Sequence, residues 1–138
     1  MTTCFHRRAA ILAIACVCSA LSAAAQTPPR RSLYDRYTEP IQIYKSGLGT
    51  FTKPMSSKNT EAQAFFDQGF QMMYSFAKPE AVRSFRESWK RDPNCAICYW
   101  GEAWAWGSYL NAPMNAEESP YAYAAARKAL MRNKYLGA

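Results

Sequence analysis

Residues 61–94 read EAQAFFDQGFQMMYSFAKPEAVRSFRESWKRDPN, and this stretch decides the fold. Its large apolar residues recur every three or four positions, which is the spacing of one buried helix face. We predict a first helix over 61–76 and a second helix that begins near Pro79 and ends at Asp92. Pro79 suits the first turn of a helix, and Pro93 disfavours helical geometry in the residue before it.

Two further helices are predicted downstream. The third begins after Asn94, and a loop over 111–115 follows it. This loop either only joins helices or takes part in binding. The fourth helix begins near Glu117, runs through an alanine-rich stretch and ends near Lys134. The chain is therefore expected to be all-α.

The predicted helix starts carry polar signals. Thr60 and Gln63 fit a capping box, in which each side chain bonds the backbone amide of the other residue. Glu117 and Glu118 suit the first turn of the fourth helix, because acidic residues are favoured at the positive end of the helix dipole. Adjacent positions face different directions on a helix, so these two carboxylates form a poor acid/base pair.

The order of residue sizes across 62–95 resembles the tetratricopeptide repeat, a unit of two helices that stacks with its neighbours. The matching positions, in chain order, are Phe65, Gly69, Ala81, Phe85, Ser88 and Pro93. The small residues let two helices approach closely, and Phe85 fills the space beside them. A second unit opens at Ala96, with Tyr99 at the bulky position and Ala103 at the small one. If Ala126 then takes the next small role, Leu130 takes the aromatic one.

A longer string over 50–114 resembles a group of exported bacterial proteins that carry tetratricopeptide repeats. The resemblance implies two helix-turn-helix hairpins in a short α-solenoid over 61–138. It also implies a groove for a protein or peptide partner, with no catalytic residue and no cofactor. An array usually needs three or more units. We therefore predict either a truncated product or a chain that covers its last face by self-association or by stacking with further repeats.

The N-terminal 60 residues precede the repeats. Residues 1–25 have the layout of a cleaved secretory signal: a basic start, an uncharged apolar run, and three alanines. An uncleaved anchor, a twin-arginine signal and a lipid-modified cysteine are the alternatives. Residues 26–60 are expected to form an irregular lead-in, with a short strand or turn at 41–44. The export signal predicts a periplasmic or secreted protein without a membrane span after cleavage.

The charge of the chain indicates a solvated basic surface. Lys and Arg number 17 against 10 Asp and Glu, and signal cleavage removes two of these basic residues, which leaves 15 against 10. The basic residues form no dense run, so nucleic acid is not a predicted partner. An affinity for acidic partners is the alternative.

Cys95 and Cys98 form a CxxC pair at the start of the third helix. One interpretation is a structural disulfide or a pair of buried thiols, and the other is thiol–disulfide exchange, since a helix N-terminus favours the thiolate. The β-α-β setting of redox motifs is not predicted here. Because the only histidine, His6, lies in the signal, two further metal ligands are lacking and no metal site is predicted.

Aromatic residues crowd the third helix and the turn after it: Trp100, Trp104, Trp106 and Tyr109. They cannot all face one core, because helical spacing puts Trp106 on the side of Tyr99 and the other two tryptophans one position round. Packing between helices is one interpretation. The other is that some of these rings line the partner-binding groove, since Trp and Tyr are frequent anchors of binding surfaces.

Overall fold

The computed structural model describes residues 29–135, and this part of the chain is all-helical, as predicted. It contains five helices and no strand: α1 (Leu33–Thr38), α2 (Thr60–Tyr74), α3 (Lys78–Arg91), α4 (Ala96–Trp106) and α5 (Ser119–Tyr135). Among the described residues no helix is long and apolar enough to cross a membrane. The predicted signal over 1–25 lies outside the described residues.

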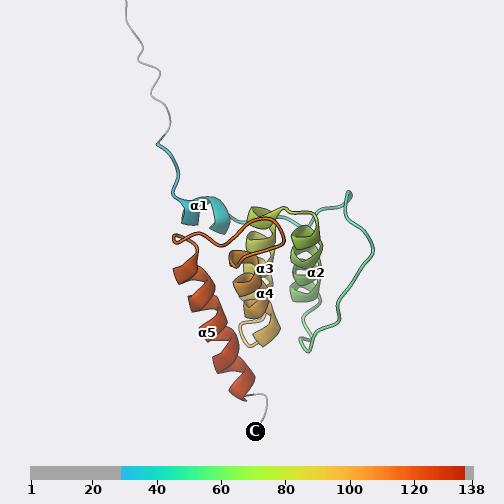
Figure 1. The fold of residues 1–138 in the computed structure, drawn as a ribbon. Coiled ribbons are helices and arrows are strands. Elements are labelled where there is room, and N and C mark those ends of the chain that lie inside the picture. The colour runs from blue at the N-terminus through green and yellow to red at the C-terminus, as the bar shows by residue number, and fades with distance from the viewer. Residues whose placement is uncertain (1–28, 136–138) are drawn as a thin grey trace, which may run out of the picture. The chain divides into compact units, whose positions relative to one another are not determined.

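From α2 onward, helices that follow one another along the chain pack together, in the compact unit that begins at Arg31 (Figure 1). α3 packs on α2, α4 on α3, and α5 on α4, while α4 also contacts α2 and α1 contacts α3. The helix order and the two proline-marked boundaries were predictable from the sequence. The lead-in runs alongside α2, as Figure 1 shows.

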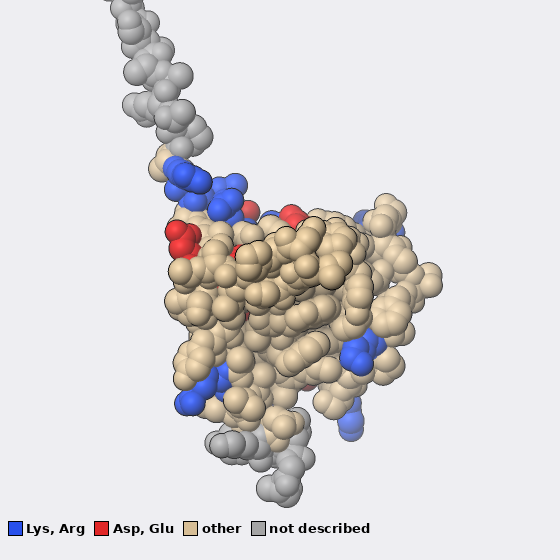
Figure 2. All heavy atoms as spheres, in the orientation of Figure 1, with Lys and Arg blue, Asp and Glu red and all other residues tan. Residues whose placement is uncertain are grey.

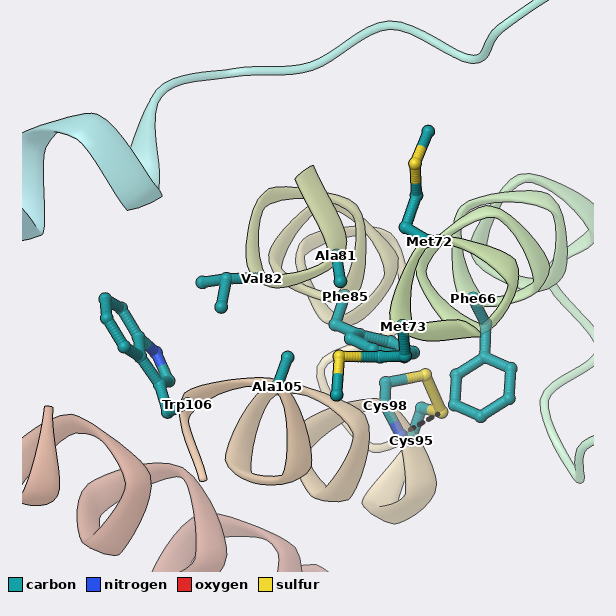
Figure 3. Packing of buried hydrophobic residues seen from close by; sticks show 10 residues of the cluster. All are labelled: Phe66, Met72, Met73, Ala81, Val82, Phe85, Cys95, Cys98, Ala105 and Trp106. Carbon is teal, nitrogen blue, oxygen red and sulfur yellow. Dashed lines mark hydrogen bonds between the residues drawn. A yellow bond between two sulfur atoms is a disulfide. The ribbon is translucent and has the colours of Figure 1, made fainter. Parts of the chain in front are cut away.

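The core is centred on Phe85, which points from α3 into the space between α2 and α4 (Figure 3). Two glycines make room for its fully buried ring. A Cβ built on Gly69 of α2 would lie 3.0 Å from the Phe85 ring, and one built on Gly101 of α4 would lie 2.4 Å from it. The close approach predicted around Gly69 is confirmed. Gly101 plays the same role from the other side and was not singled out in the sequence.

The start of α2 differs from the prediction. Asn59 caps the helix, because its side chain accepts a hydrogen bond from the Ala62 amide at 3.0 Å, and Thr60 is already helical. Gln63 bonds the lead-in instead of the residue before the helix. The capping box is therefore wrong, and an Asx cap one residue earlier replaces it.

The start of α5 also differs. The helix begins at Ser119, so Glu117 and Glu118 precede its first turn. Glu118 is buried, and its Oε1 lies 2.7 Å from Nζ of Lys78 at the start of α3. The loop before α5 therefore ties the second hairpin to the first through a buried ion pair, which the dipole prediction missed.

The lead-in contains one short helix and no strand between residues 29 and 59. In α1, which was not predicted, the Ser32 hydroxyl accepts a hydrogen bond from the Asp35 amide and so caps the first turn. Residues 41–44 are irregular rather than a strand, although Ile41 is buried.

Candidate binding surface

Polar side chains along the outer side of α2 hold the backbone of the lead-in. Asp67 accepts a hydrogen bond from the Lys53 amide at 2.9 Å. The Gln63 side chain accepts from the Met55 amide at 3.1 Å and donates to the Lys53 carbonyl at 2.9 Å. These bonds go to backbone groups, and Asp67 also accepts a hydrogen bond from the Thr52 hydroxyl. α2 therefore holds this segment mainly through its backbone.

Two more glutamines of α2 bond the backbone of the lead-in in the same way. Gln68 accepts from the Tyr44 amide at 2.8 Å and donates to the Gln42 carbonyl at 3.0 Å. Gln71 donates to the Phe51 carbonyl at 3.0 Å. We call these four side chains of α2 the clasp. They stand at positions i, i+4, i+5 and i+8 of one helix: Gln63, Asp67, Gln68 and Gln71. The clasp fixes the lead-in so that Phe51 lies against α2.

A chain of aromatic contacts begins at Phe51 and crosses from α2 to α4. We call its members, Phe51, Phe70, Tyr74 and Trp104, the aromatic row. Phe70 is the hub, with ring centroids 5.4 Å from those of Phe51, Tyr74 and Trp104. Such separations are typical of favourable aromatic pairs. Tyr74 and Phe51 are 70% and 54% exposed, so the row forms surface as well as core.

Two shallow hollows flank Tyr74. The first has a volume of about 350 Å³ and is lined by Phe51, Phe70, Gln71 and Tyr74. The second has a volume of about 330 Å³ and is lined by Met73, Tyr74, Phe76, Trp104, Tyr109 and Leu110. No lining residue carries a charge, and in Figure 2 the charged side chains lie mostly toward the margins of the visible face. The hollows suit apolar side chains of a partner.

Phe76 is displayed at the second hollow by a strained backbone. It follows α2 with φ of 59°, a left-handed conformation that glycine usually takes. The amide of Phe76 bonds the Met73 carbonyl and the amide of Ala77 bonds the Met72 carbonyl, which is the Schellman pattern of a helix end. The Phe76 ring is 53% exposed and its centroid lies 5.9 Å from that of Tyr109. A bulky exposed side chain at a glycine position is consistent with a binding surface.

The four rings suggested for partner binding separate into two groups. Trp104 lies in the aromatic row, Trp100 stacks on it at 5.5 Å and is 45% exposed, and Tyr109 lines the second hollow. Trp106 is fully buried. For Trp106 the partner-binding prediction is wrong.

Trp106 is buried because two elements remote in sequence close over it. Its ring stacks on Tyr37 of α1 at 4.9 Å and meets Tyr121 of α5 at 5.0 Å. Its indole N–H points toward Glu102, which also accepts hydrogen bonds from Arg86 and Trp89. The buried carboxylate of Glu102 is thus surrounded by several donors. Together, the contacts of Trp106 and Glu102 join α1, α3, α4 and α5.

The two cysteines are joined in a disulfide at the start of α4. Both are buried in the core beside Phe66 and Phe85 (Figure 3). The Sδ of Met55, from the lead-in, lies 3.7 Å from each sulfur, and Ser88 Oγ lies 3.1 Å from the sulfur of Cys98. This environment packs the disulfide as an apolar core element.

The remaining repeat-signature positions fall mainly in the core. Phe65, Ala81 and Ser88 are buried, and the Ser88 hydroxyl donates to the Ala62 carbonyl at 2.7 Å. Tyr99 is buried against Trp89, with centroids 5.1 Å apart. Ala103 is half-buried on α4, and Pro93 is exposed in the turn before it.

Three side chains outside the aromatic row have pKa shifts. Burial raises the pKa of Tyr37 above its usual range. Burial raises the pKa of Tyr99 above its usual range, and the nearby Arg132 offsets this only in part. Burial alone would raise the pKa of Glu87, but hydrogen bonds from Lys90 and Arg91 outweigh it and hold that pKa below its usual range. None of the three shifts moves its group toward neutral pH, so none of these residues is tuned for acid/base chemistry there.

Between residues 29 and 135, no group of three or more His, Cys, Asp or Glu is placed to hold a metal ion.

The chain was compared with known families, curated proteins and solved structures. None of them matches it. The tetratricopeptide-like hairpin arrangement therefore stays a prediction beyond the all-helical fold.

Proposed function

We propose that the chain is an exported, tetratricopeptide-like scaffold that binds an extended peptide segment of a partner protein along the aromatic row and catalyses no reaction. The observation that carries this proposal is the aromatic row itself, an exposed and uncharged set of rings with a hollow on either side of Tyr74. Aromatic side chains bury much area with few rotatable bonds, which makes them effective anchors.

The clasp supports an extended ligand in particular. α2 already holds one segment without helix, turn or bend, residues 51–55 of the lead-in, through backbone hydrogen bonds, and places the Phe51 ring against Phe70. A partner peptide would continue from that ring across Tyr74 toward Trp104. Its backbone would lie extended, so alternate apolar side chains would enter the two hollows.

Export is supported by two independent features. The predicted signal directs the chain out of the cytoplasm. The Cys95–Cys98 disulfide is of the kind that persists in oxidising compartments.

The test uses a library of seven-residue peptides selected on the purified protein, with affinities measured by titration calorimetry. In Tyr74→Ser, which alters a 70% exposed ring of the row, we expect selected peptides to bind about tenfold more weakly. Tyr123→Ser is the matched control, because Tyr123 is 66% exposed and lies outside both hollows. Equal affinity for the two variants would overturn the proposal, as would failure to select any peptide.

Thiol–disulfide exchange is the alternative function. An attacking thiolate must reach a sulfur atom of the disulfide, and Cys95 and Cys98 are 3% and 0% exposed. We expect the native disulfide to resist a weak reductant and to open only when the chain is unfolded. Mass measurement after alkylation, native and denatured, checks this. Rapid and reversible reduction of the folded chain would favour the redox function instead.

A further inference from the structure

Residues 51–55 of the lead-in, which we call the strap, meet α2 through alternate residues. The N–H and the C=O of Lys53 both point to the clasp, which accepts from the first at 2.9 Å and donates to the second at 2.9 Å. The other backbone bonds come from Phe51 and Met55, two positions to either side. A period of two is that of an extended chain. One edge of the strap therefore faces α2 as it would face a neighbouring strand.

The bonds between strap and clasp leave most of the strap in solvent. Pro54, which has no N–H, stands at an intervening position that these bonds skip. Phe51 is 54% exposed, and Thr52 and Lys53 are exposed as well. Segments with exposed backbone hydrogen bonds and few buried apolar contacts open without unfolding of the whole chain. The strap is thus held largely by groups that any extended chain could offer.

The part of the lead-in before the strap is anchored more firmly. Ile41 is buried, and the Gln68 side chain, which holds the Tyr44 amide at 2.8 Å, is only 3% exposed. Between this anchor and the strap lies Gly47, whose φ of 88° is readily adopted only by glycine. The strap can therefore leave α2 through a change in residues 45–50, while α1 stays packed on α3.

Three side chains set the register of the strap on α2. The Phe51 ring stacks on Phe70, with centroids 5.4 Å apart. The Thr52 hydroxyl donates to Asp67 at 2.5 Å. The Sδ of Met55 lies 3.7 Å from both sulfurs of the buried disulfide. A chain that took the place of the strap would therefore need an aromatic residue, a hydroxyl residue directly after it, and a long apolar residue three positions later.

The strap ends where the aromatic row begins. From Phe51 to Met55 the strap runs antiparallel to α2, because its bonds go first to the C-terminal part of the clasp and then to the N-terminal part. In a longer bound chain, the residues before the aromatic position would therefore lie over the two hollows beside Tyr74. The lead-in itself bends at Thr50. The clasp and the row thus adjoin, and the strap covers the clasp.

We propose that the strap is a displaceable intramolecular occupant of the clasp, and that an extended segment of the partner protein replaces it. This segment carries the pattern of the strap, with an aromatic residue of its own at the position of Phe51, and its preceding residues lie on the aromatic row. The strap is autoinhibitory, because the partner must displace it to reach the clasp. This rests on the proposed peptide-binding function and adds the direction, pattern and regulation of the ligand.

Hydrogen exchange of the wild-type chain shows whether the strap opens locally. NMR compares the Lys53 amide in the strap with the Phe66 amide in the core of α2. We expect the Lys53 amide to exchange at least about a hundredfold faster after correction for intrinsic rates, because its exchange needs only local opening. Equal protection of the two amides would overturn the proposal, since the strap would then open only with the whole fold.

A proline substitution loosens the strap in the intact chain. Lys53→Pro removes the N–H that Asp67 binds, and proline is compatible with an extended backbone. The probe is the peptide GTFTKPMSS, a copy of residues 49–57, titrated into the isotope-labelled protein and followed by NMR. We expect this peptide to bind Lys53→Pro at least about tenfold more tightly than wild type, in which the attached strap competes at high effective concentration.

The matched control is Thr50→Pro, a proline at an exposed position of the lead-in outside the strap, which should bind the peptide as weakly as wild type does. Circular dichroism checks that both variants fold. Equal affinity of Lys53→Pro and wild type for the peptide, or no binding to Lys53→Pro, would overturn the proposal.

N-methylation of the peptide tests its register on the clasp. A methyl group on the amide that copies Lys53 blocks the bond to Asp67, and is expected to weaken binding at least about tenfold. A methyl group on the amide that copies Thr52 should weaken it far less, because the bonds of the strap skip that position. Equal weakening by the two methyl groups would contradict the proposed replacement, as the peptide would then bind in another register.

The strap and the proposed function can fail separately. If GTFTKPMSS binds Lys53→Pro as expected but no library peptide depends on Tyr74, the aromatic row fails and displacement of the strap is supported. If library peptides bind and GTFTKPMSS does not, the row is supported and the strap is a fixed part of the fold. A wild-type dimer in analytical ultracentrifugation that Lys53→Pro dissociates would also overturn the proposal, because two copies would then exchange their straps.

Discussion

The two hairpins, α2/α3 and α4/α5, carry related patterns of residue size but differ in what covers them. Phe85 in the first hairpin is fully buried, whereas Leu130 at the related position of the second is 60% exposed. The difference lies in the neighbour, because α4 packs on both α2 and α3. A hairpin of this kind thus completes its core only through the next helix. The related position therefore stabilises the first hairpin, where it is buried, and is exposed on the surface of the second.

The largest difference in stability between the two hairpins is expected when each of these two residues is replaced by alanine. Phe85→Ala should lower the free energy of unfolding by about 3–5 kcal/mol, because it removes a buried ring and leaves a cavity. Leu130→Ala should change it by less than about 0.5 kcal/mol, as is usual for exposed positions. Urea denaturation of the disulfide-bonded protein measures both. A similar cost for the two variants would mean that the face of α5 is covered in solution.

A smaller effect is expected at the two glycines that flank Phe85. Gly101→Ala places a Cβ within 2.4 Å of the ring, and Gly69→Ala places one at 3.0 Å. Overpacking lowers the free energy of unfolding by about 1–3 kcal/mol. Replacing a helical glycine by alanine raises it by about 1 kcal/mol, because alanine has the higher helix propensity. We expect Gly101→Ala to be clearly destabilised and Gly69→Ala to be nearly neutral in the same urea measurement. The reverse order would show that α4, rather than α2, can shift away from the ring.

The sequence predicted the helices of both hairpins because their signals are local. Apolar residues at helical spacing and the prolines at 79 and 93 act within a few residues of where they stand. The disulfide was one of the interpretations for Cys95 and Cys98, which are neighbours on a helix turn. The close approach at Gly69 followed from the resemblance to a known repeat.

The missed features depend on residues far apart in sequence. Trp106 is buried by Tyr37 and Tyr121, and neither contact follows from helix spacing. Gly101 matters only because α4 crosses the ring of Phe85. The sequence contains one sign of the clasp, a row of side-chain amides and a carboxylate along one helix. Nothing in the sequence shows which segment these side chains bind. The aromatic row depends on that segment too, since Phe51 comes from the lead-in.

The smallest expected effect is a change of stability in acid, and it concerns a carboxylate of the first hairpin. The pKa of Glu87 on α3 is held below its usual range by hydrogen bonds from Lys90 and Arg91, despite burial. A carboxyl with a lowered folded pKa contributes stability above its unfolded pKa, and loses it as pH falls through the folded pKa. Glu87→Gln should therefore cost about 0.5–1 kcal/mol at pH 7.

That cost should shrink as pH falls below the ordinary range of a glutamate, because the wild-type carboxylate then becomes protonated. Glu117→Gln, an exposed position in the loop before α5, controls for the loss of one charge and should show little difference at any pH. Urea denaturation at pH 7 and at pH 3 measures all three proteins. If Glu87→Gln differed from wild type equally at both pH values, the cost would come from the shape of the side chain rather than from its charge. The acid sensitivity of the first hairpin would then have to come from other carboxylates.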